Sequence, residues 1–369
     1  MYDERTYLLA LNFIKGLGHV GAKKLLAHFG SAKAVFEAKK GIILKIPGLR
    51  KTTIDELTSR KPLERAAEEI SKAGKINADL ICYTDKEFPV RLKQIPDAPF
   101  FLYKKGNINL NAKRYLAIVG TRKPTHYGID MTEKIIRELK AYNVVIVSGL
   151  AYGIDIIAHR AALKNNIPTI GIMGSGIDII YPAIHRNEAV KMVRNGAVIA
   201  EQPIGTQPEA YNFPTRNRVI SGMCDAILVI EAASKGGALI TAELANGYDR
   251  DVFAVPGEVG KKYSEGCNKL IRDQKAHLIT SAEDLAYFMD WSREEDILQD
   301  RSPSPDFDGL NEDERKVVEI LMANKEGIHI DMLSWQSGIP MNKIASVLLK
   351  LEFEGMIKSL SGKKLKLIK

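Results

Sequence analysis

A buried β-strand is predicted by residues 115–122, YLAIVGTR, where an apolar run ends at a glycine, a threonine and an arginine. A second such run follows a helix-length segment and ends at Ser148 and Gly149. A third, Thr169–Met173, is again followed by a glycine. Continuous apolar strands that alternate with helices are typical of a mostly parallel sheet covered on both faces. We therefore expect an α/β domain with a doubly wound sheet in the middle of the chain.

The same alternation extends this domain over about residues 76–289. Further apolar runs at 197–200, 226–230 and 252–255 predict three more strands. In open sheets of this kind, ligands bind beyond the carboxyl ends of the strands, where the strand order reverses. The loops there offer backbone N–H groups and helix N-termini, which favour phosphate. We therefore expect a phosphate-bearing ligand at this edge of the sheet.

The common nucleotide motifs are missing from these loops. Residues 174–179, GSGIDI, lack the third glycine of a dinucleotide-binding turn, and the glycines of residues 149–153 have the wrong spacing. The chain contains no Gly-x-x-x-x-Gly-Lys-Ser/Thr sequence. The sequence therefore disfavours both a dinucleotide site and a P-loop ATPase.

Other residues at the same edge suit a nucleic-acid strand. Arg122 directly follows a strand end, and the run Phe213–Arg218 places a ring beside two arginines and an amide. The glycine-rich run Lys235–Ala238 precedes a predicted helix. Arginines and open glycine backbone bind phosphates, and an aromatic face stacks on an unpaired base with about 1–3 kcal/mol. Because a duplex hides its base faces, these residues favour single strands.

These residues also have structural interpretations. Arg216 and Arg218 would fit buried salt bridges, and Phe213 would fit a hydrophobic core. Asp155 and His159 lie four residues apart on one predicted helix face, which suits acid–base catalysis but is more often capping and packing. The histidines do not have the spacing of metal ligands, and we expect neither a metal nor a cofactor.

Charge and composition limit the classes of function. The 369 residues carry a net charge of +8, and residues 1–75 alone carry +7. A basic excess permits a polyanionic partner without demonstrating one. The three cysteines, Cys82, Cys224 and Cys267, are too far apart for a disulfide framework and fit a reducing cytosol. Since no apolar run approaches the roughly 18 residues of a membrane helix, we expect a cytoplasmic protein without membrane contact.

The N-terminal segment, residues 1–75, predicts a small helical domain. It contains a helix, the turn Gly16-Leu17-Gly18, and a second helix that ends at Gly30, with a looser copy of the turn at residues 46–50. This pattern is similar to the helix-hairpin-helix module, in which glycines and a helix N-terminus meet a phosphate backbone. A helical bundle used only for packing is the alternative.

The C-terminal part follows an acidic segment. Residues 290–308 include the sequence SPSP and carry a net charge of −5, which predicts a linker. Residues 309–369 predict three helices and a β-hairpin, the pattern of a winged helix. The last of these helices, residues 341–354, has Lys343 and Lys350 as its only bases and two glutamates opposing them. Duplex binding and protein contact therefore both stay open.

Six ordered blocks of the middle domain resemble the DNA-processing protein A (DprA/Smf) family. They are residues 119–122 (VGTR), 148–155 (SGLAYGID), 174–178 (GSGID), 213–220 (FPTRNRVI), 237–242 (GALITA) and 255–257 (VPG). The resemblance implies an extended Rossmann-like domain, flanked by a helix-hairpin-helix or SAM-like helical domain and a winged-helix domain. It also implies a homodimer that protects incoming single-stranded DNA and loads the RecA recombinase onto it during natural transformation, without catalysing a reaction.

The family motifs carry over to specific positions of this chain. The resemblance implies a phosphate contact at residues 120–122, base stacking at Phe213 and a glycine-rich helix start at residues 236–238. The predicted DNA-binding residues are Gly120, Thr121, Arg122, Ser148, Gly149, Phe213, Arg216, Asn217, Arg218, Lys235, Gly236, Gly237 and Ala238. The chain departs from the family pattern in two places. Residues 235–238 stand where Ser-Gly-Ser is common, which concerns the contacts of that loop, and Gln274, past the binding loops, stands where glycine is usual.

A second family offers an enzymatic alternative. Residues 235–243 partly match the Pro-Gly-Gly-x-Gly-Thr-x-x-Glu signature of nucleotide-binding phosphoribohydrolases with the lysine-decarboxylase-like fold. The proline and the Gly-Thr spacing of that signature are missing. In this interpretation, Glu243 would be the catalytic residue.

Overall fold

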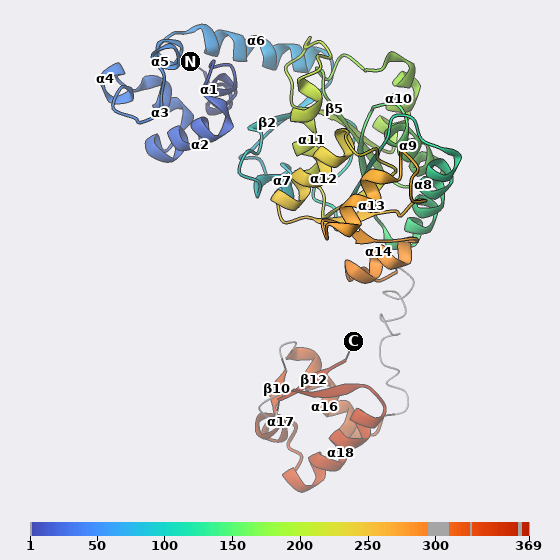
Figure 1. The fold of residues 1–369 in the computed structure, drawn as a ribbon. Coiled ribbons are helices and arrows are strands. Elements are labelled where there is room, and N and C mark those ends of the chain that lie inside the picture. Colours follow the sequence, from blue (N-terminus) through green and yellow to red (C-terminus); the bar gives the residue numbers. More distant parts are fainter. Residues whose placement is uncertain (1, 294–309, 325–326, 361–363, 369) are drawn as a thin grey trace. The chain divides into compact units, whose positions relative to one another are not determined.

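The computed structural model describes residues 2–293, 310–324, 327–360 and 364–368. Its internal contacts divide the chain into two compact units, residues 1–291 and 292–369 (Figure 1). The predicted domain boundaries stay predictions, and residues 294–308 of the predicted linker lie outside the described residues. Among the residues that are described, no helix combines the length and the apolar character that crossing a bilayer requires.

A nine-stranded, mostly parallel sheet forms the centre of the first unit, as far as the structure describes it. In spatial order its strands are β1 (Asp79–Cys82), β2 (Phe101–Lys105), β6 (Gly196–Ala200), β5 (Thr169–Met173), β4 (Val145–Gly149), β3 (Tyr115–Gly120), β7 (Ala226–Ile230), β8 (Asp251–Ala254) and β9 (His277–Leu278). The chain passes from β3 outward through β4, β5 and β6, and then returns to the other side of β3 at β7. The strand order therefore reverses at β3, and the carboxyl end of β3 is the expected ligand edge.

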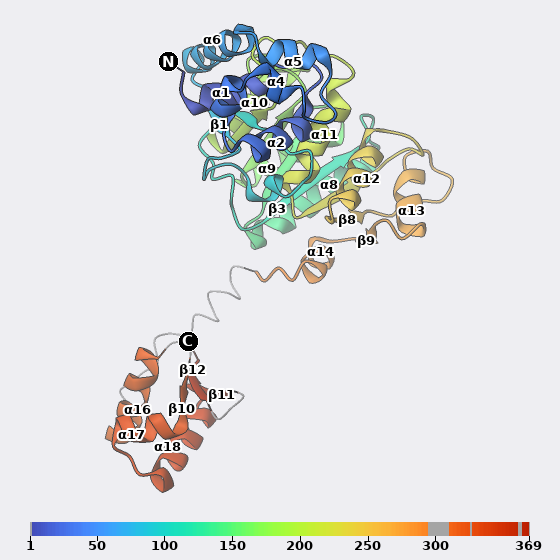
Figure 2. The ribbon, with the colours of Figure 1, turned by 90° about the vertical axis from the view of Figure 1, so that its left-hand side faces the viewer.

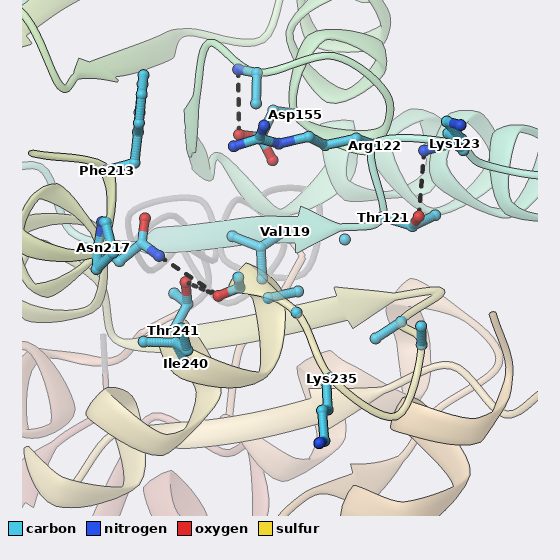
Figure 3. A pocket seen from close by; sticks show the side chains of 18 of the residues that line it. Val119, Thr121, Arg122, Lys123, Asp155, Phe213, Asn217, Lys235, Ile240 and Thr241 are labelled. Atoms are coloured by element: carbon cyan, nitrogen blue, oxygen red, sulfur yellow. Dashed lines mark hydrogen bonds between the residues drawn. The ribbon is translucent and has the colours of Figure 1, made fainter. Parts of the chain in front are cut away.

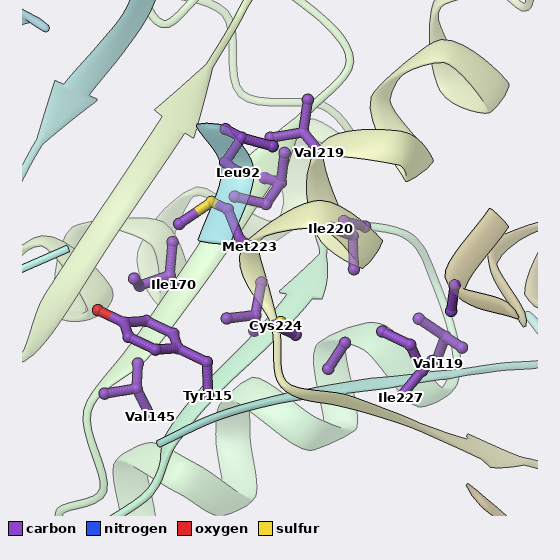
Figure 4. Close-up of a cluster of buried hydrophobic side chains, with 14 of the residues drawn as sticks. Leu92, Tyr115, Val119, Val145, Ile170, Val219, Ile220, Met223, Cys224 and Ile227 are labelled. Atoms are coloured by element: carbon purple, nitrogen blue, oxygen red, sulfur yellow. The ribbon is translucent and has the colours of Figure 1, made fainter. Parts of the chain in front are cut away.

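The sheet is covered on both faces because successive side chains of a strand point in opposite directions. In β3, Tyr115, Ala117 and Val119 face one helical layer, whereas Leu116 and Ile118 face the other. Figure 4 shows part of the first of these cores. The first layer contains α7 (Val90–Lys93), α11 (Asn212–Met223), α12 (Gly237–Gly247) and α13 (Glu265–Arg272), and the second contains α8 (His126–Leu139), α9 (Ile154–Lys164) and α14 (Ala282–Phe288). The predicted doubly wound sheet is confirmed.

The edge formed by β1 and β2 was not predicted from the sequence. These two strands are short, β1 pairs antiparallel with β2, and β2 pairs antiparallel with β6. Toward this edge of the sheet, the helix α10 (Arg186–Arg194) packs against strands β5 and β6.

Residues 2–75 form a helical bundle that packs against this antiparallel edge (Figures 1 and 2). The bundle shares one hydrophobic core with Cys82, Phe100 and Phe101 at the sheet edge. Gly30 ends α2 in the left-handed conformation, with a φ of 81°, as predicted. The helices are α1 (Glu4–Asn12), α2 (Gly18–Phe29), α3 (Ala32–Glu37), α4 (Lys40–Ile43), α5 (Lys51–Leu57) and α6 (Lys61–Lys75).

The second unit has the element order of a winged helix, as predicted. Its elements are α16 (Glu312–Ala323), β10 (Ile328–His329), α17 (Ile330–Ser337), α18 (Met341–Phe353), β11 (Ile357–Leu360) and β12 (Lys364–Leu367). Asn311 and Glu314 form a reciprocal cap at the start of α16. Residues 328–329, directly before α17, form β10 and pair with β12, and α18 begins at Met341 as predicted, with Pro340 as its N-cap. The hairpin turn, residues 361–363, lies outside the described residues.

Candidate nucleic-acid interface

A cleft of about 740 Å³ lies where the strand order reverses. Its walls are the carboxyl ends of β3 and β7 and the first turns of α11 and α12 (Figure 3). Ser148, Gly149 and Arg218 do not line this cleft. The predicted binding residues that do line it are Gly120, Thr121, Arg122, Phe213, Arg216, Asn217, Lys235, Gly236, Gly237 and Ala238.

Arg122 is an exposed cation on a fixed loop. The Thr121 N–H donates to the Glu231 carbonyl oxygen at 2.8 Å, and the Glu231 carboxylate accepts from the Thr125 N–H at 2.8 Å. The Arg122 guanidinium lies 5.9 Å from the centroid of the Phe213 ring, toward which it extends in Figure 3. It forms no ion pair within the described residues, although its charge also acts on Asp155 and Arg216 in the same cleft. Its charge is therefore available to an anionic ligand.

Phe213 lines the cleft from the first turn of α11. Its ring is half-buried and packs so closely on the loop after β5 that a Cβ on Gly174 would lie 3.0 Å from it. The Tyr181 ring lies beside it, with a centroid separation of 5.9 Å. The ring is thus held in place while it remains part of the cleft wall.

The helix α12 begins at the cleft without a side-chain cap. Its N-cap is Gly236, which offers no oxygen to the first N–H groups of the helix. Asn217 donates to the Gly237 carbonyl oxygen at 3.4 Å, and the Thr241 hydroxyl donates to the same oxygen at 3.0 Å. Asn217 therefore ties α11 to the start of α12. The uncapped N–H groups are suited to an anion.

Arg216 is buried in the floor of the cleft. Its guanidinium donates to the Ile172 carbonyl oxygen and lies beside Asp155, while its Nε has no hydrogen-bond partner within the described residues. Burial lowers the pKa of Arg216, an effect that the charge of Asp155 opposes. Burial likewise raises the pKa of Asp155, and Arg216 opposes that shift.

Asp155 and His159 do not form an acid–base pair. The two ring nitrogens of His159 lie 2.7 Å from the Thr169 hydroxyl and 2.8 Å from the Gly149 carbonyl oxygen. Burial lowers the pKa of His159 to about 4, so the imidazole is neutral near pH 7. The packing role favoured from the sequence is therefore the one that the hydrogen bonds of His159 support.

Arg218 lies on the side of α11 that faces away from the cleft. Its guanidinium forms an ion pair with Glu201 and donates to the Asp97 carbonyl oxygen. His19 of α2 lies 3.1 Å from Arg218 and 2.8 Å from Glu201. Only 7% of the Arg218 side chain is exposed. The structure therefore gives Arg218 a role in joining the helical bundle to the sheet and keeps it away from a ligand in the cleft.

Ser148 and Gly149 support the cleft from below. The Ser148 hydroxyl donates to the Ile118 carbonyl oxygen at 2.6 Å and is buried. A Cβ on Gly149 would clash with the Arg216 guanidinium and the Asp155 carboxylate. These two residues therefore shape the floor beneath the cleft without lining it.

Lys123, Lys262 and Tyr263 are among the lining residues that were not predicted from the sequence. Lys123 extends the basic rim past Arg122, and Lys262 and Tyr263 close the side of the cleft nearest β8. The Lys262 ammonium lies 5.7 Å from the centroid of the Tyr263 ring. The signals for them were the strand end before Lys123 and the strand end at residues 255–257 before Lys262 and Tyr263, since loops after parallel strands meet at one edge.

The first predicted hairpin of the N-terminal bundle contacts other parts of the chain. The Lys15 N–H, directly before the predicted turn Gly16-Leu17-Gly18, donates to the Glu56 carboxylate at 2.6 Å. His19, in the first turn of α2, packs against Glu201. This geometry supports the packing interpretation of the bundle.

Two family models match the chain. The model described as DNA recombination-mediator protein A matches residues 79–290, and that of the DprA winged helix domain matches residues 301–363. Protein Smf from Synechocystis sp. is 33% identical over 305 residues, which cover 80% of this chain and 77% of that protein.

Solved structures with a similar fold carry related names. DNA processing protein A from Streptococcus pneumoniae superposes with a TM-score of 0.67 and 34% identity, over 78% of this chain and 98% of that one. DNA processing protein A from Helicobacter pylori, whose structure concerns its single-stranded DNA binding mode, gives a TM-score of 0.53 and 29% identity, over 58% of this chain and 98% of that one. The chain belongs to the DNA recombination-mediator protein A family.

Proposed function

We propose that the cleft at the carboxyl end of β3 binds single-stranded DNA. The observation that carries this proposal is the convergence of the Arg122 guanidinium, the Phe213 ring and the uncapped start of α12 on one cleft. Guanidinium and backbone N–H groups bind phosphate oxygens, and the ring offers its face to an unpaired base. A duplex could use the cations but would leave the ring without a ligand.

We further propose, from family membership, that the protein acts as a homodimer. In this proposal it protects incoming DNA and loads the RecA recombinase onto it during natural transformation. The single-stranded DNA binding mode of the related Helicobacter pylori protein supports the choice of ligand.

The groups around the cleft support binding rather than catalysis. Asp155 faces Arg216, and both ring nitrogens of His159 are occupied. Glu243, the catalytic candidate of the phosphoribohydrolase interpretation, is exposed, pairs with Lys275 at 2.9 Å and does not line the cleft. The position of Glu243 therefore does not support the enzymatic alternative at the proposed site.

The winged-helix unit favours protein contact over duplex binding. Lys343 of α18 forms an ion pair with Asp313, and Lys350 forms one with Glu314 at 2.8 Å. Both basic side chains of α18 thus form ion pairs within the unit, which weakens the attraction of this helix to phosphate.

A competition assay tests the proposed ligand. In this assay, a labelled oligo(dT) is first bound to the full chain. Unlabelled single-stranded or duplex oligonucleotides are then added as competitors at two salt concentrations. We expect the single strand to displace it at much lower concentrations in both salts, because stacking persists when phosphate contacts are screened. Equal displacement by the duplex would contradict single-strand binding.

Phe213→Ala is expected to weaken oligo(dT) binding by about 1–3 kcal/mol, which is roughly 5- to 150-fold. The salt dependence should stay unchanged because the substitution removes a base contact and no charge. Fluorescence anisotropy across a salt series measures both quantities. Phe353→Ala, at an exposed phenylalanine of the second unit, is the matched control and should bind as wild type does. A variant Phe213→Ala with wild-type affinity would exclude the ring from the site.

A further inference from the structure

Two exposed tyrosines continue the aromatic surface that begins at Phe213. Tyr181 lies in the loop after β5 and is 48% exposed, and Tyr152 lies between β4 and α9 and is 50% exposed. The three rings surround a small hollow that is also lined by Arg122 and Arg216. A single exposed tyrosine is ordinary. Three aromatic rings beside the exposed Arg122 guanidinium form a combined apolar and cationic surface that matches a single strand, with Arg216 buried beneath it.

The rings are held in place by their neighbours. The ring centroids of Tyr181 and Phe213 are 5.9 Å apart, with an angle of 39° between the planes. Tyr152 meets the imidazole of His185 edge to face at 5.2 Å, and the Nδ1 of this buried histidine lies 2.8 Å from the Leu150 carbonyl oxygen. Neither tyrosine hydroxyl makes a hydrogen bond within the described residues. A polar contact within the chain therefore does not explain why these rings are at the surface.

The hollow among the rings does not hold a base. Its volume is about 40 Å³, close to the roughly 30 Å³ that one molecule occupies in liquid water. Bases would therefore lie on the outward faces of the rings, with the phosphates toward Arg122. Such a surface tolerates any base, since every base has a π-face.

We propose that Tyr181 and Tyr152 are further base-stacking positions, so that the bound strand leaves the cleft at Phe213 and runs across the loops after β5 and β4. This inference rests on the proposed function and adds to it a path and a direction away from the cleft. The ligand class is an unpaired nucleobase within a single strand.

The substitution Tyr181→Leu tests this path because leucine keeps apolar bulk and removes the ring face. We expect the affinity of the full chain for oligo(dT) to fall about tenfold, and Tyr181→Phe to bind as wild type does. An oligonucleotide of the same length made of abasic nucleotides should bind wild type and Tyr181→Leu equally, because the lost contact is to a base. Tyr2→Leu, at an exposed tyrosine that does not line the cleft, is the matched control.

The outcomes separate this inference from the proposed function. If wild type binds oligo(dT) and Tyr181→Leu binds it equally well, the path across Tyr181 is wrong and the cleft remains. If Tyr181→Leu loses as much affinity for the abasic strand as for oligo(dT), the ring does not stack and the inference is also wrong. If wild type binds no single-stranded DNA, the proposed function fails and this inference fails with it.

Discussion

Arg218→Ala is expected to destabilise the first unit by about 3–5 kcal/mol, the usual cost of removing one partner from a buried ion pair. The substitution would leave the Glu201 carboxylate, of which 11% is exposed, without its guanidinium and would remove the donor to the Asp97 carbonyl oxygen. Because Arg218 does not line the cleft, the folded variant should bind single-stranded DNA with the salt dependence of wild type. Urea unfolding measures the first effect, and anisotropy in a salt series measures the second.

The matched control for this variant is Arg272→Ala. Arg272 is 73% exposed, and its ion pair is with the adjacent Asp273. Its removal should change the free energy of unfolding by no more than about 1 kcal/mol. Arg218 would be a ligand-binding residue if Arg218→Ala were as stable as this control and its slope of log K against log salt fell by the amount expected for one lost phosphate contact.

Arg122→Ala is expected to weaken DNA binding and to leave the stability of the first unit unchanged, the reverse of Arg218→Ala. The side chain is exposed and has no ion pair within the described residues, so its removal should leave the urea midpoint unchanged. A hydrogen bond to a charged group contributes about 1.5–3 kcal/mol, so the affinity for oligo(dT) should fall roughly 10- to 150-fold. One lost phosphate contact on a single strand should also reduce the slope of log K against log salt by about 0.7.

Arg122→Lys separates charge from geometry in the same assay. Lysine keeps the positive charge but loses the planar fork that binds two phosphate oxygens, so the salt slope should be retained while part of the affinity is lost. An Arg122→Ala variant with wild-type affinity and slope would remove Arg122 from the proposed site.

The sequence predicted the sheet well because its signals are local. The apolar runs that became β3, β5 and β7 are continuous and end in small residues, and these features directly reflect a parallel strand covered on both faces. The short strands β1 and β2 also contain apolar residues, but β2 pairs antiparallel with β1 and with β6, and β6 lies about a hundred residues further along the chain. Such non-local pairing leaves no clear pattern in one sequence.

The candidate site could be predicted only in part from the sequence, because a linear motif does not show which of residues 216–218 face the cleft. In an α-helix, residues two apart are separated by about 200° around the axis, so Arg216 and Arg218 cannot both face one cleft. The partners of Arg218, His19 and Glu201, come from α2 and from the end of β6. Neither contact could be read from the motif itself, whereas the placement of Arg122 and Phe213 at strand and helix ends could.

Photo-crosslinking locates the bound strand most directly. Oligo(dT) in which thymines are replaced by 5-iodouracil is irradiated on the full chain, and the crosslinked peptides are identified by mass spectrometry, since this base reacts with aromatic side chains that it touches. The account predicts a crosslink at Phe213, lost in Phe213→Ala. Crosslinks confined to residues 2–75 or to the winged-helix unit, with none at Phe213, would contradict the assignment of the cleft.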